Sequence, residues 1–263
     1  MKGRADPKIK NHKSKISNTD MNYGLYTIFL GMRSRQNTLE AQANNIANAS
    51  TTGFKAERIL YSSIEAEKRG KGDGQNLVAG VSTTSGTDFT MGSIEQTGRS
   101  LDVAIDGDAF LQIQTPRGPR FTRAGNLSLN ADGQLVTKNG DLVVGENGPI
   151  TVPPKGEISI GADGTLGAEG KVFDTLKLVR FNTPASALIK EGDSLFMMTG
   201  NEMPQQNVNS RVVQGALENS NVNSISEMVA MINNNREFDS LQKSMTLLMN
   251  DIGRKISGEI AKL

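Results

Sequence analysis

The feature that most limits how this chain can fold is a helical pattern near its N-terminus with no means of burying its own apolar side. The pattern runs from Met21 to about Asn48, and its apolar residues recur at intervals of three or four: Leu25, Ile28, Met32, Leu39 and Ile46. This spacing places them on one face of a helix. Arg35 and Gln42 stand where a strict heptad would have apolar residues, which favours packing in a larger bundle or array. The helix therefore needs a partner.

A polar run from Ala43 to Lys55 is expected to end this helix. Asparagine and threonine side chains compete for backbone hydrogen bonds, and Gly53 permits the positive φ that a sharp exit requires. Residues 55–68 carry a short helical or extended pattern, and a run rich in glycine, serine and threonine follows to about Ser100. This run is typical of a linker or an irregular extended region.

A second helical pattern begins near the C-terminus and has a much broader apolar stripe. Ser224 or Asn223 is suited to cap it, with Glu227 placed for a capping box after Ser224. The stripe consists of Ile225, Met228, Val229, Ile232, Phe238, Leu241, Met245, Leu248, Ile252 and Ile256. At about 1.5 to 3 kcal/mol per large side chain, its burial represents roughly 15 to 30 kcal/mol before entropy is subtracted. We expect the two terminal helices to pair, and we expect that pairing to leave part of the stripe for assembly.

Between residues 101 and 196 the apolar period switches to two, which indicates short strands. The pairs that favour tight hairpins recur through this region, namely Asp106-Gly107, Asp132-Gly133, Asn139-Gly140 and Asp163-Gly164. Two stretches resemble each other weakly, one from Asp132 to Gly140 and one from Asp163 to Gly170. We interpret them as hairpins built twice in the same way. The pattern predicts an antiparallel sandwich or barrel-like domain.

The fold class that follows is α+β, in which long terminal helices pack together as an assembly domain and a central, mainly antiparallel β domain separates them in the sequence. The expected boundaries are a basic disordered leader over 1–20, the helices over 21–55 with 215–263, linkers over 56–100 with 197–214, and the β domain over 101–196.

Composition excludes several kinds of chemistry. The chain has no cysteine, which removes disulfides and thiolate metal sites, and its one histidine is His12 in the basic leader. Its 29 basic and 28 acidic residues nearly cancel, so the chain as a whole has no nucleic-acid or membrane signature. The leader is open to three interpretations: a disordered tail, a start site that truly lies at Met21, or a nucleic-acid-binding arm.

Three motifs that suggest ligands fail on inspection. Gly70-Lys71 lacks the flanking residues of a phosphate-binding loop. No dinucleotide fingerprint lies between a strand and a helix. Asp102, Asp106 and Asp108 lack the distal glutamate of a calcium-binding loop. Paired carboxylates for acid-base chemistry stay open, but nothing in the sequence selects a pair.

Four ordered motifs resemble those of the flagellar rod and hook protein family. The first reads Ala43-Asn44-Asn45-Ile46-Ala47-Asn48 with Thr52-Gly53-Phe54-Lys55. The central two read Leu101-Asp102-Val103-Ala104-Ile105-Asp106-Gly107-Asp108-Ala109-Phe110 and Phe121-Thr122-Arg123-Ala124-Gly125-Asn126. The last reads Gln214-Gly215-Ala216-Leu217-Glu218 with Ser220-Asn221-Val222-Asn223 and Glu227-Met228-Val229. Ala109 stands where the family often has glycine. The length and the Leu25-Tyr26-Thr27 opening resemble the proximal rod protein most, with the distal rod protein as runner-up.

The resemblance implies a structural subunit of the bacterial flagellar basal body, in a rod that spans the periplasm, with no catalytic activity, cofactor or metal. It implies export through the flagellar type III apparatus and helical polymerisation around a channel. The implied partners are other copies of the chain, neighbouring rod and hook axial proteins and the export apparatus, with no nucleic acid and no direct membrane insertion. The terminal helices are expected to become ordered on assembly. Two other classes stay open, a non-flagellar surface filament or adhesin subunit and a carbohydrate-active β-domain enzyme.

The residues expected at the assembly interface come from both helices and from the polar runs beside them. From the N-terminal part they are Leu25, Ile28, Met32, Leu39, Asn44, Asn45, Ile46, Asn48, Gly53 and Phe54. From the C-terminal part they are Asn221, Val222, Asn223, Ile225, Met228, Val229, Ile232, Phe238, Leu241, Met245, Leu248 and Ile252. We expect the asparagine amides to bond backbone groups of neighbouring subunits.

Overall fold

The computed structural model describes residues 18–64, 80–154, 156–200, 202–206 and 210–260. Most of the leader and the Gly70-Lys71 loop lie outside these residues. The described chain forms two compact units, and each is considered by itself. The first contains the described parts of residues 1–36, 61–82 and 235–263, and the second contains residues 37–60 and the described parts of 83–234.

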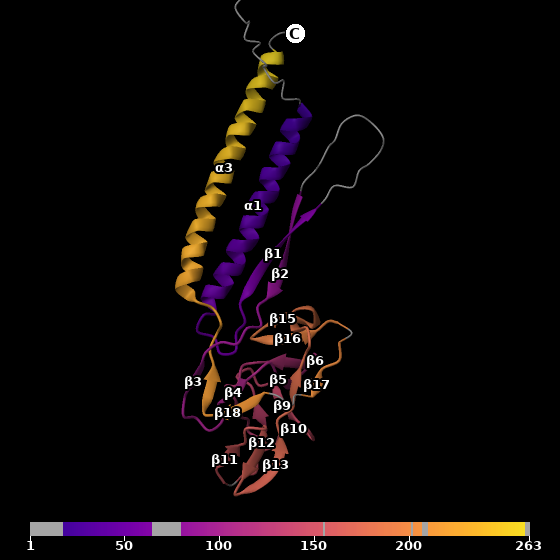
Figure 1. Cartoon of the computed structure of the whole chain (residues 1–263), viewed down its shortest axis with the longest axis vertical. Helices are drawn as coiled ribbons and strands as arrows, with labels where there is room; N and C mark the ends of the chain where they lie inside the picture. Colours follow the sequence, from indigo (N-terminus) through magenta and orange to yellow (C-terminus); the bar gives the residue numbers. More distant parts are fainter. Residues whose placement is uncertain (1–17, 65–79, 155, 201, 207–209, 261–263) are drawn as a thin grey trace, which may run out of the picture. The chain divides into compact units, whose positions relative to one another are not determined.

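Two long helices, α1 (Asn18–Ala47) and α3 (Ser224–Ile260), form the helical part of the structure (Figure 1). They pack together as the sequence predicts. In the first unit, Arg35 Nη2 lies 2.6 Å from Glu237 Oε2. In the second, Asn234 Nδ2 donates to Gln42 Oε1 at 3.5 Å. The two polar residues that interrupt the α1 heptad thus meet polar partners on α3, so the interruptions mark paired positions in the helix contact.

The ends of the helices differ slightly from the expected ones. Helix α1 begins three residues earlier than the predicted Met21. At the start of α3, Asn223 is the cap, because its Oδ1 accepts a hydrogen bond from the Ser226 backbone N–H at 3.0 Å. Of the two candidate caps, the structure therefore uses Asn223. The Ser224 capping box predicted as the alternative is not the one formed.

The strands lie between the helices in the sequence. The first group is β1 (Glu57–Ile64), β2 (Gly80–Thr87), β3 (Ile94–Gln96), β4 (Val103–Asp106), β5 (Phe110–Thr115), β6 (Gly118–Thr122), β7 (Ser128–Leu129), β8 (Leu135–Val136), β9 (Leu142–Gly145) and β10 (Gly148–Pro149). The second is β11 (Ile158–Ile160), β12 (Thr165–Ala168), β13 (Lys171–Thr175), β14 (Leu178–Arg180), β15 (Leu188–Gly192), β16 (Leu195–Met198), β17 (Gln205–Gln206), β18 (Arg211–Gln214) and β19 (Ala216–Glu218). A single turn of helix, α2 (Pro184–Ala187), precedes β15.

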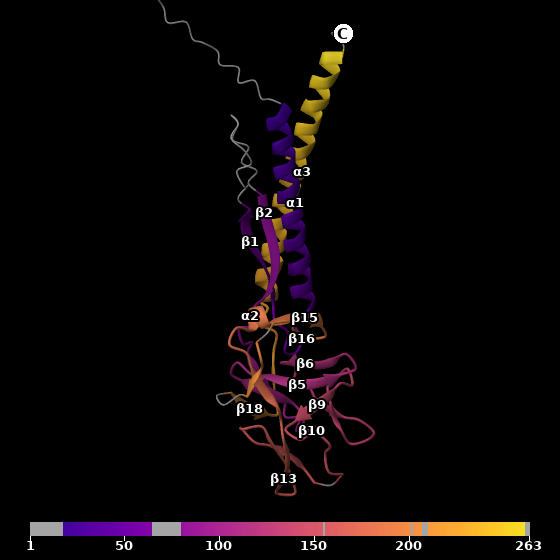
Figure 2. The same ribbon diagram turned by 90° about the vertical axis from the view of Figure 1, so that its right-hand side faces the viewer.

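The region expected to be a linker contains paired strands. β1 and β2 pair with each other and lie side by side in both views (Figure 1, Figure 2), and β3 pairs with β19 from the C-terminal part. The prediction of extended structure is correct, but the prediction of irregularity is wrong for these stretches. Glycine, serine and threonine dominate β2, so its composition concealed a strand that is held by pairing.

Within the described residues, ten strands form the largest sheet, in the order β15-β16-β6-β5-β9-β8-β7 with β10, β14 and β17 attached to its sides. β11, β12 and β13 form a second, three-stranded sheet, and β4 pairs with β18. Adjacent strands of the large sheet run antiparallel wherever their register is defined. The predicted antiparallel β domain is confirmed.

Two buried clusters fill this β domain. The larger is aliphatic and includes Ile105, Leu111, Ile113, Val143 and Leu176. The smaller is largely aromatic and is built around Phe110, Phe121, Phe181 and Phe196, with Phe89 packed against it. These residues come mainly from alternate positions of the strands, which is how the period-two pattern of the sequence becomes a core.

Three of the four predicted tight turns join paired strands. Asp132-Gly133 joins β7 to β8, Asn139-Gly140 joins β8 to β9, and Asp163-Gly164 joins β11 to β12. The prediction of a hairpin at Asp106-Gly107 is wrong, because β4 pairs with β18 and not with β5. Gly107 has φ +131° and lies so close to Ser210 that an added Cβ would come within 2.3 Å of its Oγ. The absence of a side chain at Gly107 thus allows two distant segments of the chain to lie close together.

The two similar sequence stretches also share backbone geometry. In the first, the Asn130 N–H donates to the Gln134 carbonyl at 3.0 Å, and in the second the Gly161 N–H donates to the Thr165 carbonyl at 2.8 Å. Leu135 and Leu166, one residue further on, are each only 1 % exposed. The interpretation as repeated hairpin construction is thus supported by matching bonds and matching core residues.

Candidate assembly interface and charged junction

The apolar stripe of α3 divides into two faces. Phe238, Leu241, Met245, Leu248 and Ile252 are half-buried, and Leu241 marks their direction because it lies 3.5 Å from where a Cβ of Gly31 on α1 would be. Leu241 thus contacts α1, and at 100° per residue the other four lie on the same side of α3 as Leu241. The side chain of Ile256 lies outside the described residues.

The remaining four apolar residues of the stripe point elsewhere, and we call them the α3 outer face: Ile225, Met228, Val229 and Ile232. Their exposed fractions are 74 %, 48 %, 55 % and 55 %. At 100° per residue they lie on the side of the helix opposite Asn234, which is 4 % exposed and bonds to α1. The sequence predicts that helix pairing leaves part of the stripe for assembly, and in the structure these four residues are the exposed part.

Helix α1 shows the same division. Leu25, Ile28, Met32, Leu39 and Ile46 are half-buried. Tyr26 and Phe29, which were not among the predicted interface residues, are 49 % and 50 % exposed. Phe29 is two positions from Gly31 and so points away from the α3 contact. We call Tyr26 and Phe29 the α1 outer face.

The asparagines at the end of α1 are used within the chain. Asn45 is 1 % exposed, its amide donates to the Glu57 carbonyl at 2.9 Å, and its Oδ1 accepts the Glu57 N–H at 2.8 Å. Asn48 Nδ2 donates to Asn44 Oδ1 at 2.9 Å, and Asn44 Nδ2 donates to Glu57 Oε2 at 3.3 Å. The polar atoms of Asn45 are thus bonded within the chain, and the expectation that these amides bond neighbouring subunits stays a prediction.

Two other predicted interface residues of the N-terminal part are also buried. Gly53 has φ +65°, as the sequence predicts, and Phe54 is 4 % exposed. At the C-terminal side, Asn221 Oδ1 accepts the Ala56 N–H at 2.7 Å, and Val222 is half-buried. These residues hold the two terminal segments of one chain together, which is a role inside the subunit.

A buried cluster of three charged residues lies at the centre of this arrangement, and we call it the charged junction. Lys55, Arg123 and Glu218 are 1 %, 3 % and 0 % exposed. Lys55 Nζ lies 2.6 Å from Glu218 Oε1, and Arg123 Nε donates to Glu218 Oε2 at 2.7 Å. Carbonyls accept further hydrogen bonds from both cations: Lys55 binds that of Thr90, and Arg123 binds those of Ile105, Gly107 and Ala109. Pairing together with such hydrogen bonds is what makes buried charge tolerable.

A third cation lies beside the junction. Lys190 Nζ lies 3.7 Å from the centre of the Phe54 ring and donates to the Lys55 carbonyl at 2.5 Å. Burial lowers the pKa of Lys190 to about 8, although the charge of Glu57 acts in the opposite direction. Burial also lowers the pKa of Lys55, against the opposing effect of Glu218.

The Lys190 ammonium group should make the stability of the protein vary with pH in the alkaline range. Its pKa in the folded state, about 8, is below that of an unfolded lysine, so the unfolded chain binds more protons between about pH 8 and 10.4. The free energy of unfolding therefore gains a contribution that rises with pH across this window. Urea unfolding followed by circular dichroism, from pH 7 to 10.5, measures it as the difference between the native protein and Lys190→Met. Parallel pH curves for the two proteins would contradict the assignment.

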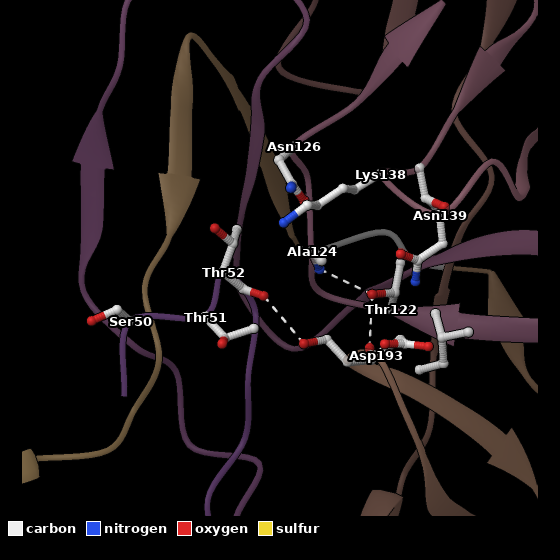
Figure 3. Close-up of a pocket in the computed structure, with 12 residues that line it drawn as sticks. Ser50, Thr51, Thr52, Thr122, Ala124, Asn126, Lys138, Asn139 and Asp193 are labelled. Carbon is white, nitrogen blue, oxygen red and sulfur yellow. Dashed lines mark hydrogen bonds between the residues drawn. The ribbon is translucent and has the colours of Figure 1, made fainter. Parts of the chain in front are cut away.

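A polar hollow of about 270 Å³ borders the polar run after α1 (Figure 3). Ser194 and Asp193 form the turn between β15 and β16 with φ +57° and +50°. The Ser194 hydroxyl donates to the Thr52 carbonyl at 3.3 Å, and the Ser194 carbonyl accepts the Thr122 hydroxyl at 2.9 Å. The turn is thus fastened to the segment that leaves α1, which accounts for two left-handed residues without glycine.

No metal site emerges from the acidic residues that tempted a calcium interpretation. The Asp102 carboxylate is fully buried and is bound by Arg99 and Thr97. Although burial raises the pKa of Asp102, the hydrogen bonds from Arg99 and Thr97 outweigh this and lower it. Across the described residues, no three acidic, histidine or cysteine side chains gather as metal ligands. Nor does any described helix have the length and apolar character that a membrane span requires.

In a comparison with known proteins, three family models match separate segments of the chain. A model described as flagella basal body rod protein matches residues 25–55. One for the flagellar hook protein FlgE/F/G D1 domain matches residues 104–168, and one for the flagellar basal body rod FlgEFG protein C-terminal region matches residues 213–247. The flagellar basal-body rod protein FlgF of Caulobacter vibrioides is 36 % identical over 225 residues, covering 83 % of this chain and 91 % of that protein.

The chain belongs to the flagellar basal-body rod protein family. FlgF of Salmonella typhimurium is 34 % identical, covering 89 % of this chain and 97 % of that protein, and FlgG of Bacillus subtilis is also 34 % identical, covering 84 % and 93 %. The predictions of a structural, non-enzymatic subunit of the bacterial flagellar rod, located in the basal body where the rod spans the periplasm, are confirmed by this membership. Neither the adhesin nor the enzyme alternative gains support.

The charged junction is the part of this rod-family site that the sequence interpretation missed. Lys55, Arg123 and Glu218 each belong to a different one of the three matched segments. The signal was present, because each is a charged residue within a motif of mostly uncharged residues. What the sequence did not show is that the three motifs meet, since the contacts span up to 163 positions.

Proposed function

We propose that this rod-family subunit polymerises through its terminal helices, joining other copies of itself and the neighbouring rod and hook proteins. The α3 outer face carries the proposal, because four large apolar side chains at least 48 % exposed stand together on one helix. Burying what remains exposed of such residues contributes roughly 1 to 2 kcal/mol each. Contiguous exposed apolar surface of this kind marks sites of protein association.

The α1 outer face supports the same proposal independently. Tyr26 and Phe29 combine large contact area with few rotatable bonds, and aromatic residues are enriched at protein interfaces.

Passage through the flagellar type III export apparatus is a further part of the proposal, and the absence of cysteine is compatible with export as an unfolded chain. A place in the proximal rather than the distal rod stays a prediction, because relatives named FlgF and FlgG both match the chain.

Replacing Ile225, Val229 and Ile232 together with glutamine tests the proposal. Glutamine keeps helix propensity high while removing apolar surface, so the purified variant should keep its circular dichroism spectrum and its thermal midpoint. In a strain that lacks its own copy of the gene, the variant should fail to restore swimming in soft agar. Basal bodies purified from that strain should lack complete rods in electron micrographs.

The matched control replaces exposed apolar residues of the β domain. Val172 on β13 and Leu129 on β7 are 69 % and 41 % exposed, and glutamine at both positions should leave motility unchanged. Normal rods in the triple α3 variant would remove the main support for assembly through this face.

A further inference from the structure

The segment that leaves α1, residues 53–57, is held on both sides by other parts of the chain, and we call it the exit segment. The Gly53 N–H donates to the Glu218 carbonyl at 2.8 Å, and the Asn221 N–H donates to the Phe54 carbonyl at 3.4 Å. The Ala56 N–H donates to Asn221 Oδ1, and the Glu57 N–H to Asn45 Oδ1. Three of these four bonds come from Glu218 and Asn221. The exit from α1 therefore depends on residues that are more than 160 positions later in the chain.

The charged junction adds an electrostatic condition. Among the described residues, Glu218 is the carboxylate that forms ion pairs with Lys55 and Arg123. The charge of Arg123 lowers the pKa of Lys55, which means that the two cations repel each other where they are buried. Without Glu218 the same pocket would hold two unpaired positive charges, an arrangement that proteins tolerate poorly.

A chain in which residues 218–221 are not in place cannot, for this reason, bury Lys55. Lys55 then stays in water, and Phe54 and Gly53 lose the positions that depend on it. The end of α1 is held to β1 by the amides of Asn44 and Asn45 in that state. By contrast, Leu135 is held by a hydrogen bond of its own, from its N–H to the Ile150 carbonyl at 2.9 Å, which involves no residue of the charged junction.

We propose that the charged junction, together with Asn221, is a latch that locks the exit from α1 only when the C-terminal segment has arrived. A chain becomes competent to assemble through α1 when the latch closes, so an incomplete chain is kept from polymerising. The link to assembly rests on the proposed function. The latch itself is a property of one compact unit, and it can be tested separately.

The test compares full-length native protein with Glu218→Gln, which keeps the shape of the side chain and removes its charge. Hydrogen–deuterium exchange followed by NMR should show amide exchange at Gly53, Ala56 and Glu57 at least tenfold faster in the variant. Exchange at Leu135 should be unchanged. Light scattering at increasing protein concentration should show that self-association requires at least tenfold more protein than for the native chain.

Two further variants keep the outcome interpretable. Asp102→Asn replaces another fully buried carboxylate that pairs with an arginine, Arg99, and it should leave both the exit segment and self-association unchanged. Asn221→Ala removes the acceptor of the Ala56 N–H without leaving a buried charge unpaired, so it reports on the latch if Glu218→Gln fails to fold. It should accelerate exchange at Ala56 at least tenfold and weaken self-association.

The results separate the latch from the proposed function. Native exchange rates in the exit segment of Glu218→Gln or Asn221→Ala would overturn the latch. Faster exchange with native self-association would also overturn it. If the α3 outer-face variant assembles normally while Glu218→Gln does not, the proposed use of that face fails and the latch stands.

Discussion

A protein with alanine in place of Gly53 is expected to lose about 2 to 5 kcal/mol of folding free energy and to give no motility. The backbone at this position has φ +65°, and an added Cβ would lie 2.4 Å from both Ala124 N and Arg123 C. The left-handed conformation costs alanine roughly 1 to 2 kcal/mol, and an overpacking clash adds about 1 to 3. The clashing atoms are main-chain atoms, so no side-chain rotation relieves them.

The clash also falls on the loop that carries Arg123. Movement of this loop would disturb the hydrogen bonds from Arg123 to Glu218 and thus open the charged junction. Urea unfolding of the purified variant measures the stability, and complementation in a strain without the gene measures motility. Both effects should appear together, because one displaced backbone segment causes them.

Gly98→Ala is the matched control. Gly98 has φ +74°, but nothing lies within 4 Å of its added Cβ. It should therefore show the conformational cost alone, about 1 to 2 kcal/mol, and it should support normal swimming. Equal losses of stability at Gly53 and Gly98 would mean that the contact with Arg123 and Ala124 is not the cause.

The sequence predicted the helices and the β domain because both depend on periodicity, which is a local property. The apolar spacing in α1 needs only neighbouring residues to be read, and the turn pairs Asp132-Gly133 and Asn139-Gly140 specify hairpins by their own backbone preferences. The hairpin prediction at Asp106-Gly107 failed because the pairing there depends on a distant part of the chain. There the partner of β4 is β18, more than 100 positions later, and no local signal indicates it.

The exposed faces of the two helices were predicted less completely, because the same residue type occurs on packed and on exposed faces. Leu241 and Val229 are both apolar residues of one stripe, yet one packs on α1 and the other is 55 % exposed. Only the direction of the partner helix separates them. Asn45 shows the same limit for polar residues, since its burial against Glu57 follows from how β1 returns past the end of α1.

Phe196→Ala is expected to destabilise the β domain by about 3 to 5 kcal/mol, the usual cost of deleting a buried phenylalanine ring. Phe196 is fully buried, and its ring centre lies 5.1 Å from that of Phe89 and 5.8 Å from that of Phe110. It also pairs in register with Phe121, two residues before Arg123. The loss of stability should therefore reach the charged junction, and urea unfolding and amide exchange at Gly53 would measure the two effects.

Alanine in place of Phe29 should have the opposite effects, with little change in stability but impaired rod assembly. Phe29 is 50 % exposed on α1, and alanine has the higher helix propensity, so the stability of the purified protein should change by less than about 1 kcal/mol. Rod assembly should nevertheless be impaired, because the ring is lost from the α1 outer face. A Phe29→Ala protein that swims normally would show that this face is not used, whereas one that unfolds as readily as Phe196→Ala would show that the ring supports the subunit itself. Loss of assembly without loss of stability is the result that distinguishes an interface residue from a core residue.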